Sequence, residues 1–256
     1  MRKLFIFLIA ATLTACAVSP TGRPQLKLFP DAEIAQMGVA SYQKIKQETP
    51  IERSRAVNSY VDCVANSITR IVGGSWEVTV FAEDQANAFA LPGGKIGVYT
   101  GLLKIADGQS QLATVVGHEV AHVLADHGNA RVSTQFATQS ALQLGSAIVG
   151  GGAGGQLAIA ALGAGAQVGV LLPFSRGQES EADILGVNLM ARAGFDPRAS
   201  VQLWQNMQRQ GGNRPSSFLS THPSEGNRIQ ALQQHMPEAL QIYNQARAQG
   251  RRPNCG

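Results

Sequence analysis

Residues 112–127 read LATVVGHEVAHVLADH, and the interpretation of the whole chain starts from this stretch. At its centre, residues 118–122 form His-Glu-Val-Ala-His, an HExxH motif. The chain has only five histidines in 256 residues, so a chance match to this motif is expected far less than once. Because the surrounding residues are mostly apolar, we predict that the motif lies on a buried helix over residues 109–130.

The motif has the residue types and the spacing of a catalytic metal site. Positions i and i+4 of a helix differ by about 40° of rotation, so His118 and His122 can bind one zinc ion. Glu119 is offset by about 100°, which suits a general base that acts on zinc-activated water. The alternative is a helix with two exposed histidines. We therefore predict one Zn²⁺ per chain, although these ligands also suit other divalent metals.

A catalytic zinc ion needs a third protein ligand and an open fourth position. The metzincin pattern requires glycine and histidine three and six residues after the second histidine, where this chain has Ala125 and Gly128. That class is excluded. His127 lies about 140° around the helix from His122, so we do not expect it to bind the same ion.

Residues 175–183, SRGQESEAD, hold the remaining candidates for the third ligand. Glu179 and Asp183 are four residues apart, so one helix face can present a carboxylate to the metal and a second carboxylate to a ligating histidine. Glu181 lies about 200° from Glu179, so only one of the two glutamates can face the metal. The alternative is an acidic first turn that the helix dipole favours.

Three motifs together resemble the HtpX and CAAX prenyl protease family of gluzincin zinc metallopeptidases. They are HExxH, the sequence of residues 175–183, and Thr221-His222-Pro223 with Arg228 six residues after the histidine. The resemblance implies that Glu179 is the third ligand and that Asp183 supports the site. It also implies that His222 stabilises the oxyanion and that Arg228 orients or assists it. From the residues alone, a histidine before proline is an equally good helix cap.

The same resemblance places residues 87–90, Asn-Ala-Phe-Ala, on the edge strand of the active-site cleft. A substrate peptide would pair there with Asn87, Ala88 and Phe89 by β-augmentation. The alternative is an ordinary core strand.

The order of predicted elements indicates an α+β fold, mainly helical, with a small antiparallel β-sheet and the HExxH helix. Apolar spacing predicts helices over residues 31–48 and 51–72, and strands are predicted at residues 76–81, 87–91 and 95–100. Further helices are predicted over residues 175–194, 196–210 and 222–235, and from Pro237 onward. Between them, residues 132–175 carry no charge and are rich in glycine, which favours small-residue helices, or a gate over the site, rather than a membrane span.

The amino terminus resembles a bacterial lipoprotein signal. A basic start, a short apolar run and the sequence Leu-Thr-Ala-Cys at residues 13–16 predict a signal peptide over residues 1–15 and acylation of Cys16. The alternative is an ordinary signal peptide with a chance cysteine. Residues 16–30 are predicted to be a lipidated tether and residues 31–256 the zinc metallopeptidase domain.

These features predict a periplasm-facing protein, lipid-anchored to the outer membrane of a Gram-negative bacterium, in the small periplasmic lipoprotein (LoiP-like) branch of the family. Ala17, directly after the cysteine, favours that membrane. With Cys16 acylated, Cys63 and Cys255 form an even pair in an oxidising compartment, which makes a disulfide plausible. The alternative is two free thiols.

The charge pattern limits the choice of partners. The formal charge is +4, and the charged residues are scattered rather than grouped, so we expect no nucleic-acid partner. The sequence specifies no oligomeric state. We predict a zinc endopeptidase that cleaves unfolded or misassembled envelope polypeptides. The alternative is a chaperone-like assembly factor with little or regulated proteolysis.

Overall fold

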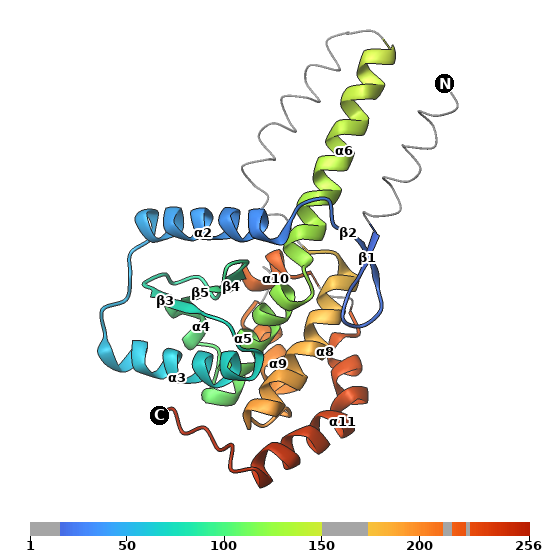
Figure 1. Ribbon diagram of the computed structural model, residues 1–256. Coiled ribbons are helices and arrows are strands. Elements are labelled where there is room, and N and C mark those ends of the chain that lie inside the picture. The colour runs from blue at the N-terminus through green and yellow to red at the C-terminus, as the bar shows by residue number, and fades with distance from the viewer. Residues whose placement is uncertain (1–15, 150–173, 212–216, 224–225) are drawn as a thin grey trace. The chain divides into compact units, whose positions relative to one another are not determined.

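The computed structural model describes residues 16–149, 174–211, 217–223 and 226–256 (Figure 1). The predicted signal peptide and most of the glycine-rich segment lie outside the described residues. The chain separates into two compact units, one formed by Met1–Ile34 with Asp126–Leu172 and the other by Ala35–Ala125 with Pro173–Gly256. The predicted domain boundaries stay a prediction.

The larger unit contains a three-stranded sheet of β3 (Glu77–Phe81), β4 (Ala88–Leu91) and β5 (Lys95–Tyr99), in the order β3-β5-β4. β4 and β5 are antiparallel, as a hairpin requires, and Gly93 and Gly94 adopt positive φ in the turn between them. β3 is parallel to β5, so the predicted all-antiparallel pairing is wrong in this detail. The chain that leaves β3 passes over β5 and forms β4 at the opposite edge of the sheet. Alternation of apolar residues along a strand does not predict which strand it pairs with or in which direction.

Two helices precede the sheet. α2 (Asp31–Glu48) has the predicted bounds, and α3 (Arg55–Val72) starts four residues later than predicted. It starts there because the Ser54 side chain accepts a hydrogen bond from the Val57 N–H, while Ile51 forms a β-bridge with Phe81. The buried face of α3 packs against β3 and α5.

α5 (Gln109–Leu124) follows the short α4 (Thr100–Leu103) and carries the HExxH motif. The predicted helix was too long, because the chain leaves the helical conformation at Asp126, which has a φ of 54°. A new helix, α6 (His127–Val149), then begins. α5 is buried along most of its length and packs against α3, α8, α9 and β4 (Figure 1).

The helices after residue 174 complete the larger unit. α8 (Arg176–Ala193) starts with the predicted capping box of Ser175 and Gln178, and it ends at Gly194 in the left-handed conformation. α9 (Ala199–Gly211) and the short α10 (Ser217–Thr221) follow. α11 (Arg228–Ala248) is one helix with Pro237 inside it, so the predicted break at that proline is wrong. Buried residues on one face, before and after the proline, offset its lost hydrogen bond; they are Leu232, Ala239 and Ala246.

The smaller unit contains a hairpin of β1 (Cys16–Val18) and β2 (Pro24–Leu26), together with α6. The segment predicted as a tether therefore has structure of its own. Lys27 Nζ lies 2.6 Å from Asp126 Oδ2, and the Asn129 side chain donates to the Phe29 carbonyl at 2.8 Å. None of the helices that the structure describes has both the length and the apolarity needed to cross a membrane. The mainly helical α+β class is confirmed.

Candidate metal centre

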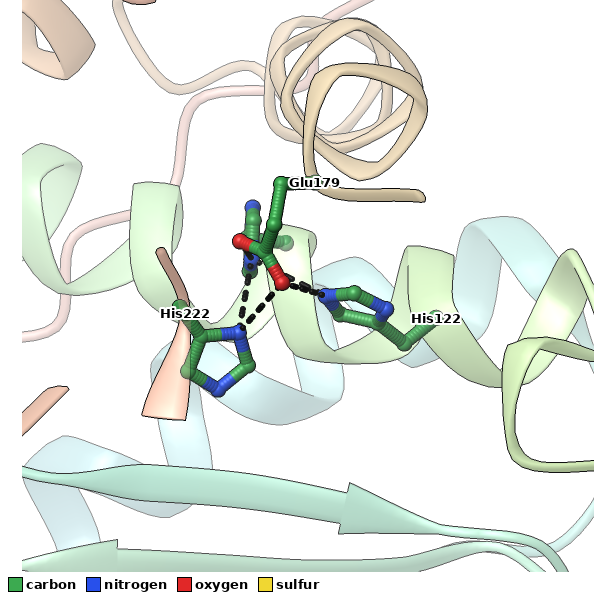
Figure 2. A group of neighbouring side chains, drawn as sticks. His122, Glu179 and His222 are labelled. Atoms are coloured by element: carbon green, nitrogen blue, oxygen red, sulfur yellow. Dashed lines mark hydrogen bonds and ion pairs between the residues drawn. The ribbon is translucent and has the colours of Figure 1, made fainter. Parts of the chain in front are cut away.

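Four buried side chains of the larger unit converge on one point. His118 and His122 come from α5, Glu179 from the first turn of α8, and His222 from the segment directly after α10. One nitrogen or oxygen atom of each lies within 4.8 Å of the corresponding atoms of the others. Figure 2 shows the Glu179 carboxylate pointing between the rings of His122 and His222.

The spacing of these atoms fits a zinc ion. His118 Nε2 lies 3.1 Å from His122 Nε2 and 3.3 Å from Glu179 Oε2, and His122 Nε2 lies 3.4 Å from Glu179 Oε1. Four ligands arranged tetrahedrally at the usual zinc distances are about 3.3 Å from one another. Two imidazoles and one carboxylate are also the donor types that catalytic zinc prefers. The predicted ligands His118, His122 and Glu179 are thus brought together at a suitable spacing.

His222 occupies the fourth corner of this arrangement. Its Nδ1 is 3.1 Å from Glu179 Oε1 and 3.3 Å from His118 Nε2, and its Nε2 is 3.3 Å from Glu119 Oε1. A catalytic zinc ion keeps one position open for water or substrate. A zinc ion held by the other three side chains would have His222 at its fourth position, which would close the centre, an arrangement that the sequence did not predict. Its role at the oxyanion stays a prediction.

Glu119 lies beside the four converging side chains, as a general base should. Its side chain is buried, and Oε1 has no hydrogen-bond partner within the described part of the chain. Burial raises the pKa of the Glu119 carboxyl above its ordinary value, while His222, His118 and the Ala90 N–H oppose this rise. A buried carboxylate with a raised pKa is well suited to accept a proton near neutral pH.

Asp183 and Arg228 form hydrogen bonds with the predicted ligands and with each other. Asp183 Oδ1 is 2.9 Å from His118 Nδ1. Because a carboxylate only accepts, this contact holds a proton on Nδ1, so that Nε2 is the ring nitrogen that would bind a metal. Arg228 donates from Nε to Asp183 at 2.6 Å and from Nη2 to Glu179 at 2.7 Å, and its guanidinium stacks on Trp204. The hydrogen bonds of Arg228 are therefore with two carboxylates, and its predicted role at the oxyanion stays a prediction.

The buried charges shift the ligand pKa values in different directions. Burial opposes ionisation of Glu179, but hydrogen bonds from the three histidines hold its pKa well below the ordinary value. Burial lowers the pKa of His118, yet the carboxylates of Asp183 and Glu179 overcome it and raise that pKa to about 10. At His122 burial has the largest effect, and it lowers the pKa of the imidazole well below its ordinary value. Glu179 therefore carries the negative charge that a cation requires.

Aromatic rings surround the four converging side chains, and sequence reasoning missed them. Phe174 stacks on His122 with ring centroids 3.9 Å apart, and Phe218 stacks on His222 at 4.3 Å. Trp204 lies edge-on to His118. The only local signal was position, since Phe174 adjoins the 175–183 motif and Phe218 is four residues before His222.

The predicted substrate strand is the edge strand β4, next to Glu119. The Tyr99 N–H donates to the Asn87 carbonyl, so Asn87 and Phe89 direct their backbone groups toward β5. The alternate residues Ala88 and Ala90 direct theirs away from the sheet, and the Ala90 N–H donates to Glu119. The outward positions are thus Ala88 and Ala90. Of the three predicted residues, only Ala88 presents its backbone to a pairing peptide.

The remaining predicted residues lie away from the centre. Cys63 on α3 and Cys255 near the carboxyl terminus are joined as a disulfide, with their Cα atoms 5.5 Å apart. The Gln109 side chain holds the same terminal segment, accepting from the Cys255 N–H and donating to the Pro253 carbonyl. Cys16 opens β1, and its acylation stays a prediction.

Comparison with known proteins gives a consistent family. Residues 52–236 match the model described as Peptidase family M48. The chain is 38% identical over 185 residues to the mitochondrial metalloendopeptidase OMA1 of Schizosaccharomyces pombe, covering 70% of this chain and 53% of that protein. The OMA1 of Arabidopsis thaliana is 38% identical over 212 residues, covering 77% and 39%. The beta-barrel assembly-enhancing protease of Escherichia coli K12 is 25% identical over 250 residues, covering 90% and 51%.

These relatives limit some conclusions and correct one prediction. The chain spans about half the length of the curated relatives it matches, or less. Several relatives with the higher identities are mitochondrial, so the predicted location at the outer membrane of a Gram-negative bacterium is contradicted. That prediction rested on residues 1–17 alone, whereas the comparisons rest on most of the folded chain. The narrower periplasmic branch of the family is likewise not supported.

Proposed function

The chain belongs to peptidase family M48, whose members are zinc-dependent metallopeptidases, and we propose that it is an endopeptidase that hydrolyses unfolded or misassembled polypeptides. One observation carries the proposal. Three donor atoms, from His118, His122 and Glu179, lie at the spacing of zinc ligands, and the buried carboxylate of Glu119 lies beside them. Serine or cysteine nucleophiles are not required for such a reaction.

Each residue of the site would have a separate role in peptide hydrolysis. A bound zinc ion would lower the pKa of a water molecule and polarise the scissile carbonyl. Glu119 would take a proton from the attacking water at Oε1 and return it to the leaving amine, so that the carboxylate is regenerated in each cycle. Asp183 would keep the His118 proton on Nδ1, and Arg228 would fix the carboxylates of Asp183 and Glu179.

The edge strand supports unfolded polypeptides as the substrate class. Pairing with Ala88 and Ala90 requires a peptide in extended conformation, which a folded protein rarely offers. β4 has no strand partner on its outer side in the part of the chain that the structure describes. The name of one group of relatives, beta-barrel assembly-enhancing protease, adds support for substrates that arise during protein assembly.

The second candidate function is a chaperone-like factor with regulated proteolysis, and the position of His222 favours it. The segment that carries His222 also contacts the chain just before β4, because the Phe218 N–H donates to the Ala86 carbonyl at 3.1 Å. If zinc is bound by the other three side chains, hydrolysis would require the His222 side chain to leave the fourth position so that water could occupy it. A centre that stays closed would bind polypeptide without cleaving it.

Proteolysis of an unfolded protein separates the two functions. The full chain is incubated with casein after loading with zinc, after treatment with 1,10-phenanthroline, and after zinc is added back. We expect cleavage that the chelator abolishes and zinc restores. Cleavage that continues after measured loss of zinc would contradict the mechanism. Suppressed aggregation of a denatured client without cleavage would favour the second function.

Acylation of Cys16 is a separate proposal, which rests on the sequence of residues 13–16. Intact-mass measurement of the processed chain tests it directly. The expected mass includes acyl chains on a new amino terminus at Cys16. An unmodified cysteine in the purified protein would contradict it.

A further inference from the structure

The two helices that carry the metal ligands approach most closely at a pair of glycines, Gly117 on α5 and Gly186 on α8. A Cβ atom added to Gly186 would lie 2.7 Å from the His118 nitrogen, 2.8 Å from its Cα and 2.9 Å from the Gly117 carbonyl carbon. A Cβ added to Gly117 would lie 2.7 Å from the Gly186 oxygen. All of these are backbone atoms, which cannot rotate away. The two backbones are therefore in direct contact.

The contact between the helices runs antiparallel, and the glycines lie next to the ligands along it. Thr114 meets Met190 at 3.4 Å, and one turn further His118 meets Asp183 at 2.9 Å. Gly117 directly precedes His118, and Gly186 is one turn after Asp183. On α8, positions 179, 183 and 186 share one face, so the glycine lies on the same face as Glu179.

We propose that Gly117 and Gly186 are positioning residues that set the distance between α5 and α8, and thereby the spacing of the zinc ligands. The inference rests on the metal centre of the proposed function. His118 and His122 would bind the ion from α5, and Glu179 would bind it from α8. Zinc sites hold their ligands to within about 0.2 Å, so the separation of the two helices must be fixed to the same degree.

A methyl group at Gly186 would exceed that tolerance. Ordinary contact between a Cβ and another heavy atom begins at about 3.4 Å. Three backbone atoms closer than 3.0 Å require the helices to separate by roughly half an ångström. The His118–Asp183 contact is one turn away, and helices transmit such a shift as rigid elements. A methyl group at Gly117 meets one atom this closely, so its effect should be smaller.

The test compares Gly186→Ala with Gly38→Ala in the full chain, loaded first with zinc and then with cobalt(II). Gly38, on α2, is the control for general destabilisation, since a Cβ there would meet backbone still more closely, 2.1 Å from the Pro92 carbonyl oxygen. We expect Gly186→Ala to lower zinc affinity about 10- to 100-fold and to change the cobalt d–d bands, which report coordination geometry. Gly38→Ala should lower the melting temperature and leave both metal readouts unchanged. Gly117→Ala should fall between the wild type and Gly186→Ala, and it carries the test if Gly186→Ala does not fold.

Two results would overturn the inference. The first is a folded Gly186→Ala chain with wild-type zinc affinity and cobalt spectrum. The second is a Gly38→Ala chain that loses metal binding to the same degree, because the effect would then follow from general destabilisation. A wild-type chain that binds neither metal would overturn the proposed function itself, and this result is distinct from the other two.

Discussion

Replacement of Asp183 by asparagine should weaken zinc binding about 10- to 100-fold. Two donors point at this carboxylate, His118 Nδ1 at 2.9 Å from Oδ1 and Arg228 Nε at 2.6 Å from Oδ2. An amide has only one acceptor oxygen, and its nitrogen donates. One of the two contacts must therefore be lost.

The magnitude follows from which contact is lost. Arg228 is always protonated, so it retains the amide oxygen and His118 faces the amide nitrogen. The His118 ring then either loses its partner or moves its proton to Nε2, the atom that faces the metal. A lost hydrogen bond to a charged group costs about 1.5–3 kcal/mol, which is roughly 10- to 100-fold in an equilibrium constant.

Competition titration with a chromogenic zinc chelator measures this change. The matched control is Asp196→Asn, which alters an aspartate that pairs with Arg198 near the surface. Such pairs contribute about 0–1 kcal/mol, so the control should bind zinc as the wild type does. Wild-type zinc affinity in Asp183→Asn would show that the Asp183 carboxylate does not support His118 as a ligand. An equal loss in both variants would show that the contact with His118 is not the cause.

Three further predictions concern other parts of the larger unit. Replacing Cys63 and Cys255 with serine should lower the free energy of unfolding by up to about 5 kcal/mol, because the bridge spans 192 positions, and it should leave zinc affinity unchanged. Urea unfolding measures the loss of stability. Two free thiols in the folded wild type would contradict the bridge. Burial raises the pKa of Tyr42 to about 12, so its contribution to stability is complete below about pH 10 and is lost as the pH rises toward 12. Tyr42→Phe should therefore lose less stability than the wild type between about pH 9 and pH 11 in urea unfolding, and equal losses would contradict this. Glu179→Gln should lose zinc and Glu181→Gln should keep it, by metal analysis of the purified variants; the reverse order would show that the wrong glutamate was chosen.

Local signals predicted the parts of the centre that lie within single helices. HExxH and the i, i+4 spacing of Glu179 and Asp183 each describe one face of one helix, and both faces point to the same centre in the structure. The capping box at Ser175 and the glycine at position 194 fixed the bounds of α8 to within a residue. These features depend on neighbouring residues only, so the sequence contains them directly.

Features that depend on distant contacts were not predictable in this way. The parallel pairing of β3 with β5 is decided by the path of the connecting chain, and apolar alternation is the same for either direction. The break after α5 lies at Asp126, whose positive φ is uncommon for residues other than glycine, although aspartate adopts it more often than most; the residue type alone therefore did not locate the break. His222 lies in the centre because α10 places it there, and α10 itself carried no recognised helix signal.

The central claim is that Glu119 is the base of a zinc-dependent hydrolysis at this site, and Glu119→Gln tests it most directly. Zinc content per chain and the initial rate of casein cleavage are measured on the same preparations of variant and wild type. We expect one zinc ion per chain in both, with cleavage by the variant reduced at least about 100-fold, because the ligands remain while the base is lost. Cleavage by a zinc-loaded Glu119→Gln chain at the wild-type rate would contradict the account.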